Sequence, residues 1–238
     1  GGRSAADVAR EAAGALEAFL DAHHETVAAL IVEPLVQGAS GMVCYDPSYL
    51  ARARALCTRY RVHLIADEIM TGFGRTGTMF ACEQAGVAPD LMLLSKGITG
   101  GFLPLACVLA SEAIYEAFYD DDAARGFLHS HSYTGNPLAC AAALAVLDIF
   151  RDDGVIAGNR ARAARWDAIA APLASHPRVR DFRRCGMIVA FEVDSGRADF
   201  ARWCFAEGIA RGILLRPIGA TVYLMPPYVI ADDEFALL

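Results

Sequence analysis

A single lysine stands out among the residues that are able to do chemistry. The 238-residue chain has 21 lysine and arginine residues, and Lys96 is the only lysine among them. It lies in LMLLSKGITGG (91–101), where an apolar run ends and three glycines follow. Arginine stays protonated, whereas a lysine can lose its proton and attack a carbonyl carbon. The sequence therefore favours Lys96 as a nucleophile over a solvated lysine at a strand end.

Polar residues follow two other apolar runs in the same manner. Gln37 comes shortly after VAALIVEP (27–34), and Asp67 ends VHLIAD (62–67). In a parallel sheet the carboxyl ends of the strands meet at one edge, and ligands bind there. We therefore expect Gln37, Asp67 and Lys96 to share one edge of a sheet.

An aspartate and a lysine at neighbouring strand ends suit pyridoxal phosphate as a cofactor. The lysine binds the cofactor covalently, and the aspartate pairs with its pyridinium nitrogen so that the ring accepts electrons. A buried carboxylate is costly unless a cation pairs with it, and the pyridinium supplies that cation. Asp67 taken alone is equally well explained as a helix cap or a core hydrogen-bonding residue.

Other site chemistries have weaker support in the sequence. GFGRTG (72–77) matches the GxGxxG pattern of nicotinamide-dependent dehydrogenases, but four residues separate it from Asp67 and only a short helix follows. His129 and His131 have no carboxylate or cysteine at ligand spacing, so no metal is expected. The GxSxG nucleophile motif of hydrolases is absent from the chain.

The pattern of apolar residues predicts an α/β fold. Helical spacing over 5–22 and after Asp46-Pro47 alternates with the apolar runs that end before Gln37, Asp67 and Lys96, as expected for a mostly parallel sheet with helices on its faces. A further short strand is expected in PLACVLAS (104–111), and Pro137 begins a helix of small residues. We expect this large cofactor-binding domain to cover residues 1–151.

A smaller α+β domain is expected over residues 152–238. An arginine-rich helix over 159–173 precedes the expected strands VRDFRRCG (179–186), MIVAFEV (187–193), ILLRPIG (213–219) and TVYLMPPYVI (221–230). These short strands without intervening long helices are typical of antiparallel pairing.

Composition excludes several classes of function. The net charge is −7 with a sequence pI near 5.3, so binding to nucleic acid is disfavoured. The seven cysteines are scattered singly, which favours a reducing, cytoplasmic location over a disulfide framework. The longest apolar stretches are too short to cross a membrane. Because the chain begins Gly-Gly-Arg and stops at ADDEFALL, we expect it to be a fragment that lacks N-terminal and C-terminal parts.

Four motifs in order resemble the class III, fold-type I pyridoxal-phosphate aminotransferases. They are IVEPLVQGASG (31–41), LIADEIMTGFGRTG (64–77), LMLLSKGITGG (91–101) and SYTGNPLACAAALAVL (132–147). The resemblance implies a fold-type I architecture, transamination and a homodimer with shared active sites. It extends from about residue 29 to residue 227.

The resemblance also implies roles for five residues around the cofactor. Lys96 would be the Schiff-base lysine and Asp67 the partner of the pyridine nitrogen. Gln37 would approach the 3-hydroxyl group, and Ile69 would pack on one ring face. Ser132, where the family usually has threonine, would bind the cofactor phosphate of the neighbouring subunit.

Three stretches narrow the resemblance within the family. The stretches 80–101, 127–143 and 214–228 look most like members that aminate 8-amino-7-oxononanoate with S-adenosylmethionine in biotin biosynthesis. Arg216 would then clamp the substrate carboxylate, with Tyr223 and the backbone near Ser130 lining the same pocket. Aminotransferases for ornithine, GABA or other ω-amino substrates share the first motifs and remain the alternative.

Family members carry further site residues ahead of the segment that this chain matches. These are a glycine-serine phosphate loop, an aromatic residue that stacks on the cofactor, and aromatic residues of the substrate pocket. A third hypothesis is therefore a chain that is catalytically silent by itself and acts as a folded dimerising module.

Overall fold

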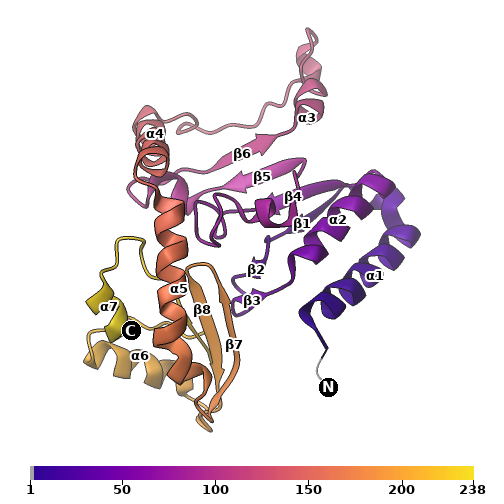
Figure 1. The fold of residues 1–238 in the computed structure, drawn as a ribbon. Coiled ribbons are helices and arrows are strands. Elements are labelled where there is room, and N and C mark those ends of the chain that lie inside the picture. Colours follow the sequence, from indigo (N-terminus) through magenta and orange to yellow (C-terminus); the bar gives the residue numbers. More distant parts are fainter. Residues whose placement is uncertain (1–2) are drawn as a thin grey trace. The chain divides into compact units, whose positions relative to one another are not determined.

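The computed structural model describes residues 3–238, and their contacts group into two compact units (Figure 1). Unit 1 contains the chain up to Leu35, Tyr45–Phe73 and Phe80–Asp153. Unit 2 contains Val36–Cys44, Gly74–Met79 and Gly154–Leu238. The two short segments Val36–Cys44 and Gly74–Met79 thus pack with residues far along the chain. The domain boundary expected near residue 152 stays a prediction for the complete protein.

Unit 1 is built on a four-stranded sheet in the order β1-β4-β5-β6. Its strands are β1 (Ala29–Val32), β4 (His63–Asp67), β5 (Leu91–Leu94) and β6 (Cys107–Ala110). The pairs β1–β4 and β4–β5 are parallel, and β6 runs antiparallel to β5. The mostly parallel sheet predicted from the apolar runs is confirmed.

Most helices of unit 1 begin after a residue whose side chain caps the first turn. Its helices are α1 (Ala5–His23), α2 (Pro47–Tyr60), α3 (Glu112–Glu116) and α4 (Pro137–Asp152), and α1 packs beside α2 (Figure 1). The Asp46 side chain accepts a hydrogen bond from the Ser48 amide, and Pro47 occupies the first turn of α2, as predicted. The unit's core consists of Leu20, Leu50, Leu56, Cys57, Val62, Leu64, Ala66 and Cys82.

The continuous apolar run 27–34 is typical of a strand that is buried on both faces, but β1 is not buried in this way. β1 lies at one end of the sheet order, and the side chain of Ile31 is 57% exposed. An apolar run is typical both of a central strand and of a strand at the sheet edge. The sequence pattern therefore did not reveal the position of this strand.

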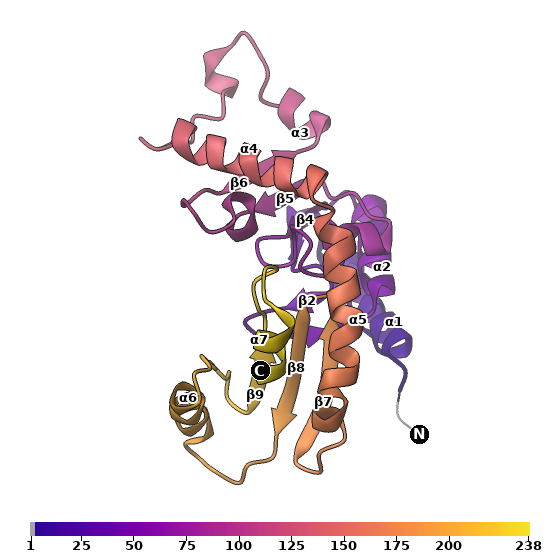
Figure 2. The same ribbon diagram turned by 60° about the vertical axis from the view of Figure 1, so that its left-hand side comes forward.

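Unit 2 combines a three-stranded antiparallel sheet with helices (Figure 2). The strands β7 (Val179–Cys185), β8 (Ile188–Val193) and β9 (Thr221–Leu224) pair in that order, and β2 (Val36–Gln37) pairs antiparallel with β3 (Val43–Cys44). The helices are α5 (Val155–Ala174), α6 (Phe200–Ala210) and α7 (Asp232–Leu237). In the core Trp166 stacks on Phe235 with ring centroids 3.9 Å apart.

ILLRPIG (213–219) was expected to be a strand, and that prediction is wrong. Within the described chain this segment contributes one isolated bridge, between Ile218 and Thr221. Pro217 has no amide hydrogen for a ladder, and Gly219 turns the chain with a φ of 59°. The segment therefore forms the approach to β9.

The described residues 3–238 include all seven cysteines, and each has a free thiol. No three histidine, cysteine, aspartate or glutamate side chains within this range gather in a way suited to a metal ion. None of the helices in the described range is both long enough and apolar enough to span a membrane.

Gly186 is expected to be the most sensitive glycine of unit 2. An added Cβ would lie 2.4 Å from the Thr76 carbonyl carbon, and the φ of Gly186 is 56°. We expect Gly186→Ala to lower the free energy of unfolding by about 3 kcal/mol, from the clash with backbone and the left-handed strain together. Urea unfolding followed by circular dichroism measures this loss.

Gly196 supplies the matched control for this substitution. Its φ is 65°, and an added Cβ there would meet nothing within 4 Å. Gly196→Ala should therefore cost only the left-handed strain, about 1 kcal/mol. Equal losses for the two variants would show that the close approach at Gly186 contributes nothing.

Candidate functional site

Asp67 and Lys96 follow neighbouring parallel strands in unit 1. Asp67 ends β4 and pairs in register with Leu93 of β5, three residues before Lys96. The Asp67 side chain is half-buried, and its Oδ1 accepts a hydrogen bond of 3.1 Å from the Ile69 amide. Within the described chain, no ion pair joins Asp67 to a cation. A half-buried carboxylate thus stands at the sheet edge where a ligand is expected, with its charge uncompensated.

Lys96 adopts an unusual backbone conformation. It is exposed, begins a short 3₁₀ helix (Lys96–Thr99), and has a φ of 47°. Left-handed conformations of residues other than glycine are uncommon, and they cluster at functional sites. A Cβ added to the next residue, Gly97, would lie 2.9 Å from the Phe73 Cβ, so the turn that carries Lys96 packs tightly against Phe73.

Glu68 is a buried residue of this site that sequence reasoning left without a role. Its side chain is fully buried and accepts hydrogen bonds from the Thr71 hydroxyl at 2.6 Å, the Ala81 amide at 3.1 Å and the Cys82 amide at 2.8 Å. The carboxylate therefore caps a 3₁₀ helix (Ala81–Ala85) and fixes the turn that carries Ile69. Burial and the neighbouring Glu68 carboxylate raise the pKa of the Cys82 thiol.

The two serines expected to contact ligands lie in an exposed loop of unit 1. Ser130 and Ser132 are both exposed. A pocket of about 700 Å³ lies beside them, lined by Ser95, by residues 103–106 and by five residues between 131 and 136. Neither serine belongs to the lining of this pocket, whereas Ser95, which directly precedes Lys96, does.

The remaining predicted residues belong to unit 2. Gln37 is exposed on β2, which pairs with β3 and does not belong to the four-stranded sheet, so the expectation that it shares a sheet edge with Asp67 and Lys96 is wrong. Arg216 and Tyr223 line a common pocket of about 490 Å³, together with apolar residues such as Leu214 and Met225. The structure thus places Arg216, expected to bind the substrate carboxylate, and Tyr223, expected to line its pocket, around one cavity.

Arg75 of the GFGRTG loop makes structural contacts within unit 2. Nη1 of Arg75 donates a hydrogen bond of 2.8 Å to the Pro226 carbonyl, and the guanidinium lies 4.6 Å from the ring centroid of Tyr228. Burial lowers the pKa of Arg75. A dinucleotide-binding motif requires its glycines to open a long helix, whereas only the five-residue 3₁₀ helix Ala81–Ala85 follows here. The geometry of the loop therefore gives the nicotinamide hypothesis no support.

Comparison with known families decides between the chemistries that these residues permit. The family model described as "Aminotransferase class-III" matches residues 3–238. The chain belongs to the class III aminotransferase family. The same family was expected from the motifs around Asp67 and Lys96.

Curated relatives in the family are identical to this chain at close to half of the aligned positions. An adenosylmethionine-8-amino-7-oxononanoate aminotransferase of Helicobacter pylori is 46% identical over 228 residues, which are 92% of this chain and 52% of the relative. A relative of the same name from Nitratidesulfovibrio vulgaris is 43% identical over 235 residues, 94% of this chain and 43% of the relative. The chain thus spans about half the length of the curated relatives it matches.

A solved structure of the family has the same fold. A PLP-bound amine transaminase from an uncultivated Pseudomonas species superposes with a TM-score of 0.91 at 34% identity. The match covers 99% of this chain and 55% of that protein. The predicted fold-type I architecture of a pyridoxal-phosphate-dependent transaminase is therefore confirmed for the described residues.

Proposed function

We propose that this chain is part of a pyridoxal-phosphate-dependent aminotransferase that converts 8-amino-7-oxononanoate to 7,8-diaminononanoate with S-adenosylmethionine as amino donor, in biotin biosynthesis. The observation that carries the proposal is the pair formed by Asp67 and Lys96 at the carboxyl ends of adjacent parallel strands. The names of the relatives that are 43–46% identical support the substrate assignment.

The residues present fit the cofactor. Asp67 is a half-buried carboxylate for which the described chain offers no cationic partner, and a protonated pyridine nitrogen would supply one. Bound pyridoxal phosphate supplies an electron sink for charge that develops on the substrate carbon. Lys96 would hold the cofactor, Gln37 would bind its 3-hydroxyl, Ile69 would contact a ring face, and Ser132 would bind the phosphate.

The chain's own residues then divide the work of transamination. Lys96 Nζ, once free, removes and returns a proton at the substrate carbon, as a positioned general base and acid. Asp67 keeps the pyridine nitrogen protonated throughout. Glu68 acts through the backbone, because its hydrogen bonds to the Ala81 and Cys82 amides hold the turn in which Ile69 lies.

Arg216 and Tyr223 are proposed to bind the substrate. The pocket that they line has apolar walls that include Leu214 and Met225, the guanidinium of Arg216 and the carboxylate of Glu234. Its apolar walls suit a long aliphatic chain, and the guanidinium fork suits the two oxygens of a terminal carboxylate. The backbone near Ser130 is proposed to contact the substrate as well.

Arg216→Ala is expected to raise the KM for 8-amino-7-oxononanoate roughly ten- to a hundredfold, because a charge-assisted hydrogen bond to the substrate is lost. Arg211→Ala is the matched control, since Arg211 is exposed, directly follows α6 and pairs with Glu207 of that helix. Steady-state kinetics of the full-length protein measure both values. An unchanged KM in Arg216→Ala would remove Arg216 from the substrate site.

The amino donor and acceptor are tested by comparing substrates. We expect the full-length protein to form diaminononanoate from S-adenosylmethionine faster than it transfers amino groups from ornithine, GABA or another ω-amino compound. The alternative, a class III enzyme for ω-amino substrates, is favoured by the likeness to an amine transaminase structure. A preference for a short ω-amino substrate would replace the biotin-pathway assignment and leave the cofactor chemistry unchanged.

The active assembly is proposed to be a homodimer, because Ser132 is proposed to bind the phosphate of the cofactor that the neighbouring subunit holds. A cytoplasmic location is proposed as well, and the seven free thiols support it.

A further inference from the structure

Gln37 lies on a hairpin whose two strands, β2 and β3, are joined by only two residue pairs. The hairpin pairs Val36 with Cys44 and Gln37 with Val43, and the turn 38–42 joins the two strands. Inside the turn the amides of Gly41 and Met42 both donate to the Gly38 carbonyl at 3.1 Å. A two-stranded ribbon of this length is not stable by its own hydrogen bonds. Contacts from elsewhere in unit 2 must therefore hold Gln37 in place.

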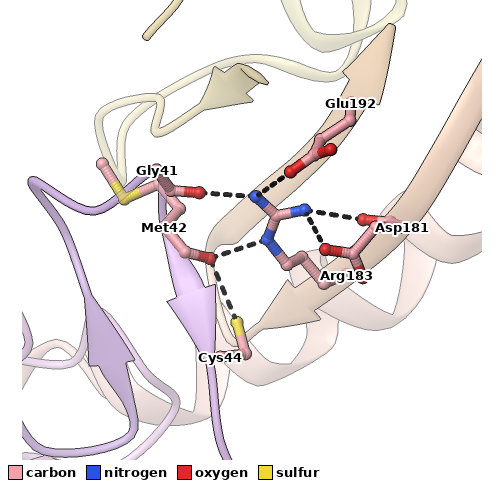
Figure 3. A network of polar contacts seen from close by, with 6 residues as sticks. All are labelled: Gly41, Met42, Cys44, Asp181, Arg183 and Glu192. Atoms are coloured by element: carbon pink, nitrogen blue, oxygen red, sulfur yellow. Dashed lines mark hydrogen bonds and ion pairs between the residues drawn. The ribbon is translucent and has the colours of Figure 1, made fainter. Parts of the chain in front are cut away.

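Arg183 of β7 supplies the most extensive of these contacts (Figure 3). Its Nε donates to the Met42 carbonyl at 2.9 Å, and its Nη2 donates to the Gly41 carbonyl at 2.5 Å. Nη1 donates to the carbonyl and to the carboxylate of Asp181, both at 2.8 Å, and the Glu192 carboxylate lies 4.0 Å from Nη2. The Arg183 side chain is only 10% exposed. The largely buried guanidinium thus has an acceptor at each of its three nitrogens, and two of these acceptors belong to the turn 38–42.

The local backbone is distorted on both sides of this contact. β7 pairs Arg180 with Glu192 and Arg183 with Ala190, so β7 carries one extra residue, a β-bulge of the kind that re-aims a side chain. Asp181, in the bulge, has a φ of 44°, and Met42, in the turn, has a φ of 55°. Residues other than glycine keep such conformations only where the surrounding structure enforces them, and they cluster at functional sites. Both strained residues accept hydrogen bonds from the same guanidinium.

The register of the sheet relates Arg183 to the proposed substrate pocket. Arg183 pairs with Ala190, and Ala190 pairs with Tyr223. Directly paired residues point to the same face of a sheet, so Arg183 and Tyr223 share a face, two strands apart. The turn also approaches β9 on this face, because a Cβ added to Gly41 would lie 3.2 Å from Thr221 Oγ1. The hydrogen bonds of Arg183 therefore hold the hairpin that contains Gln37 against the face of the β7–β8–β9 sheet that carries Tyr223.

We propose that Arg183 is a positioning residue that fixes the turn 38–42 and thereby sets the contact of Gln37 with the cofactor's 3-hydroxyl group. The inference rests on the proposed function for the identity of the ligand of Gln37. A lysine cannot replace Arg183, because one ammonium group does not reproduce the fork that binds the two carbonyls of the turn and Asp181 together.

The first test compares Arg183→Lys with Arg180→Lys in the full-length protein. Arg180 lies on the same strand, is exposed and pairs with Asp194, so its replacement is the matched control. We expect Arg183→Lys to weaken pyridoxal-phosphate binding about tenfold and to shift the visible absorption band of the bound cofactor as Gln37→Ala does. No difference between the two lysine variants would overturn the inference.

The second test is a double-mutant cycle. If Arg183 acts through Gln37, adding Arg183→Lys to Gln37→Ala should weaken cofactor binding no further. Additive losses would show that Arg183 acts independently of Gln37 and would overturn the inference. If Arg183→Lys does not fold, Asp181→Ala is the second variant to test. It removes the exposed carboxylate that pairs with the Arg183 guanidinium. It should weaken binding in the same direction, by about threefold.

Hydrogen exchange of the protein without cofactor separates this inference from the proposed function. Arg183→Lys should speed exchange of the peptide 36–44 and leave the peptide 91–99 unchanged. Faster exchange without a change in cofactor binding would overturn the positioning role. If borohydride fails to link pyridoxal phosphate to Lys96 in the unsubstituted protein, the proposed function fails, whereas the effect of Arg183 on the turn would still be measured.

Discussion

Replacing Lys96 by arginine is expected to lower transamination by at least about three orders of magnitude in the full-length protein. Arginine preserves the positive charge, but it does not lose its proton at neutral pH. It can therefore neither hold the cofactor covalently nor move a proton at the substrate carbon. Turnover of S-adenosylmethionine with 8-amino-7-oxononanoate, measured at saturating cofactor, gives the size of the loss.

Arg61 offers a control for the charge and the backbone at Lys96. Arg61 is exposed, lies in the same unit, and has a φ of 59°, close to the 47° of Lys96. Arg61→Lys exchanges the same two residue types in the opposite direction at the end of α2. It should leave turnover unchanged. A Lys96→Arg protein with ordinary turnover would exclude Lys96 from catalysis.

Asp67→Asn is expected to lower turnover by about two to three orders of magnitude, the loss typical of removing one preorganised electrostatic group. Asparagine has the same shape, and its oxygen can still accept the hydrogen bond from the Ile69 amide. Only the negative charge that keeps the pyridine nitrogen protonated is lost. The measurement is the single-turnover rate with each substrate, and the cofactor must be shown to remain bound.

Asp90→Asn is the matched control for the loss of a carboxylate. Asp90 precedes β5, accepts a hydrogen bond of 2.6 Å from the Leu64 amide, and pairs with Arg54 at 2.7 Å. These contacts belong to the fold, so Asp90→Asn should lower stability and leave the single-turnover rate close to normal. Equal rate losses for the Asp67 and Asp90 variants would mean that Asp67 acts through stability alone.

Much of unit 1 could be predicted because its local signals agree with its fold. The apolar runs before Asp67 and Lys96 became parallel strands, and Asp46 with Pro47 began a helix as expected. The edge position of β1 was not predictable, because Ile31 belongs to the same kind of apolar run as a buried strand. The apolar residues of ILLRPIG suggested a strand. Pro217, which lacks an amide hydrogen, was the signal in the sequence against that prediction.

The two residues proposed to bind the cofactor, Asp67 and Lys96, stand out in the sequence for a chemical reason. A lysine in a chain that otherwise uses arginine, and an aspartate at the end of an apolar strand, both stand out by residue type. Because both follow apolar runs, the sequence predicts that they lie at the carboxyl ends of parallel strands, and β4 and β5 are paired in parallel. The left-handed conformation of Lys96 had no such signal, because the pattern of neighbouring glycines does not specify the φ of the lysine itself.

The roles of Arg183 and Glu68 were not predicted, because their long-range partners are mostly backbone groups. Arg183 binds carbonyls some 140 positions away in the sequence, and Glu68 binds amides 13 and 14 positions ahead. Backbone partners leave no mark in the residue types, so neither contact is visible as a motif. The adjacency of Glu68 to Asp67 was the one available hint that it belonged to the site.

Borohydride reduction of the full-length protein with bound pyridoxal phosphate, followed by peptide mapping, tests the central claim most directly. Reduction makes the bond between the cofactor and its lysine permanent, so the modified residue can be identified by mass. We expect the cofactor on Lys96 alone, in the peptide that contains LMLLSKGITGG. A cofactor fixed to another residue, or no fixed cofactor at all, would contradict the assignment of Lys96 and the aminotransferase site built around it.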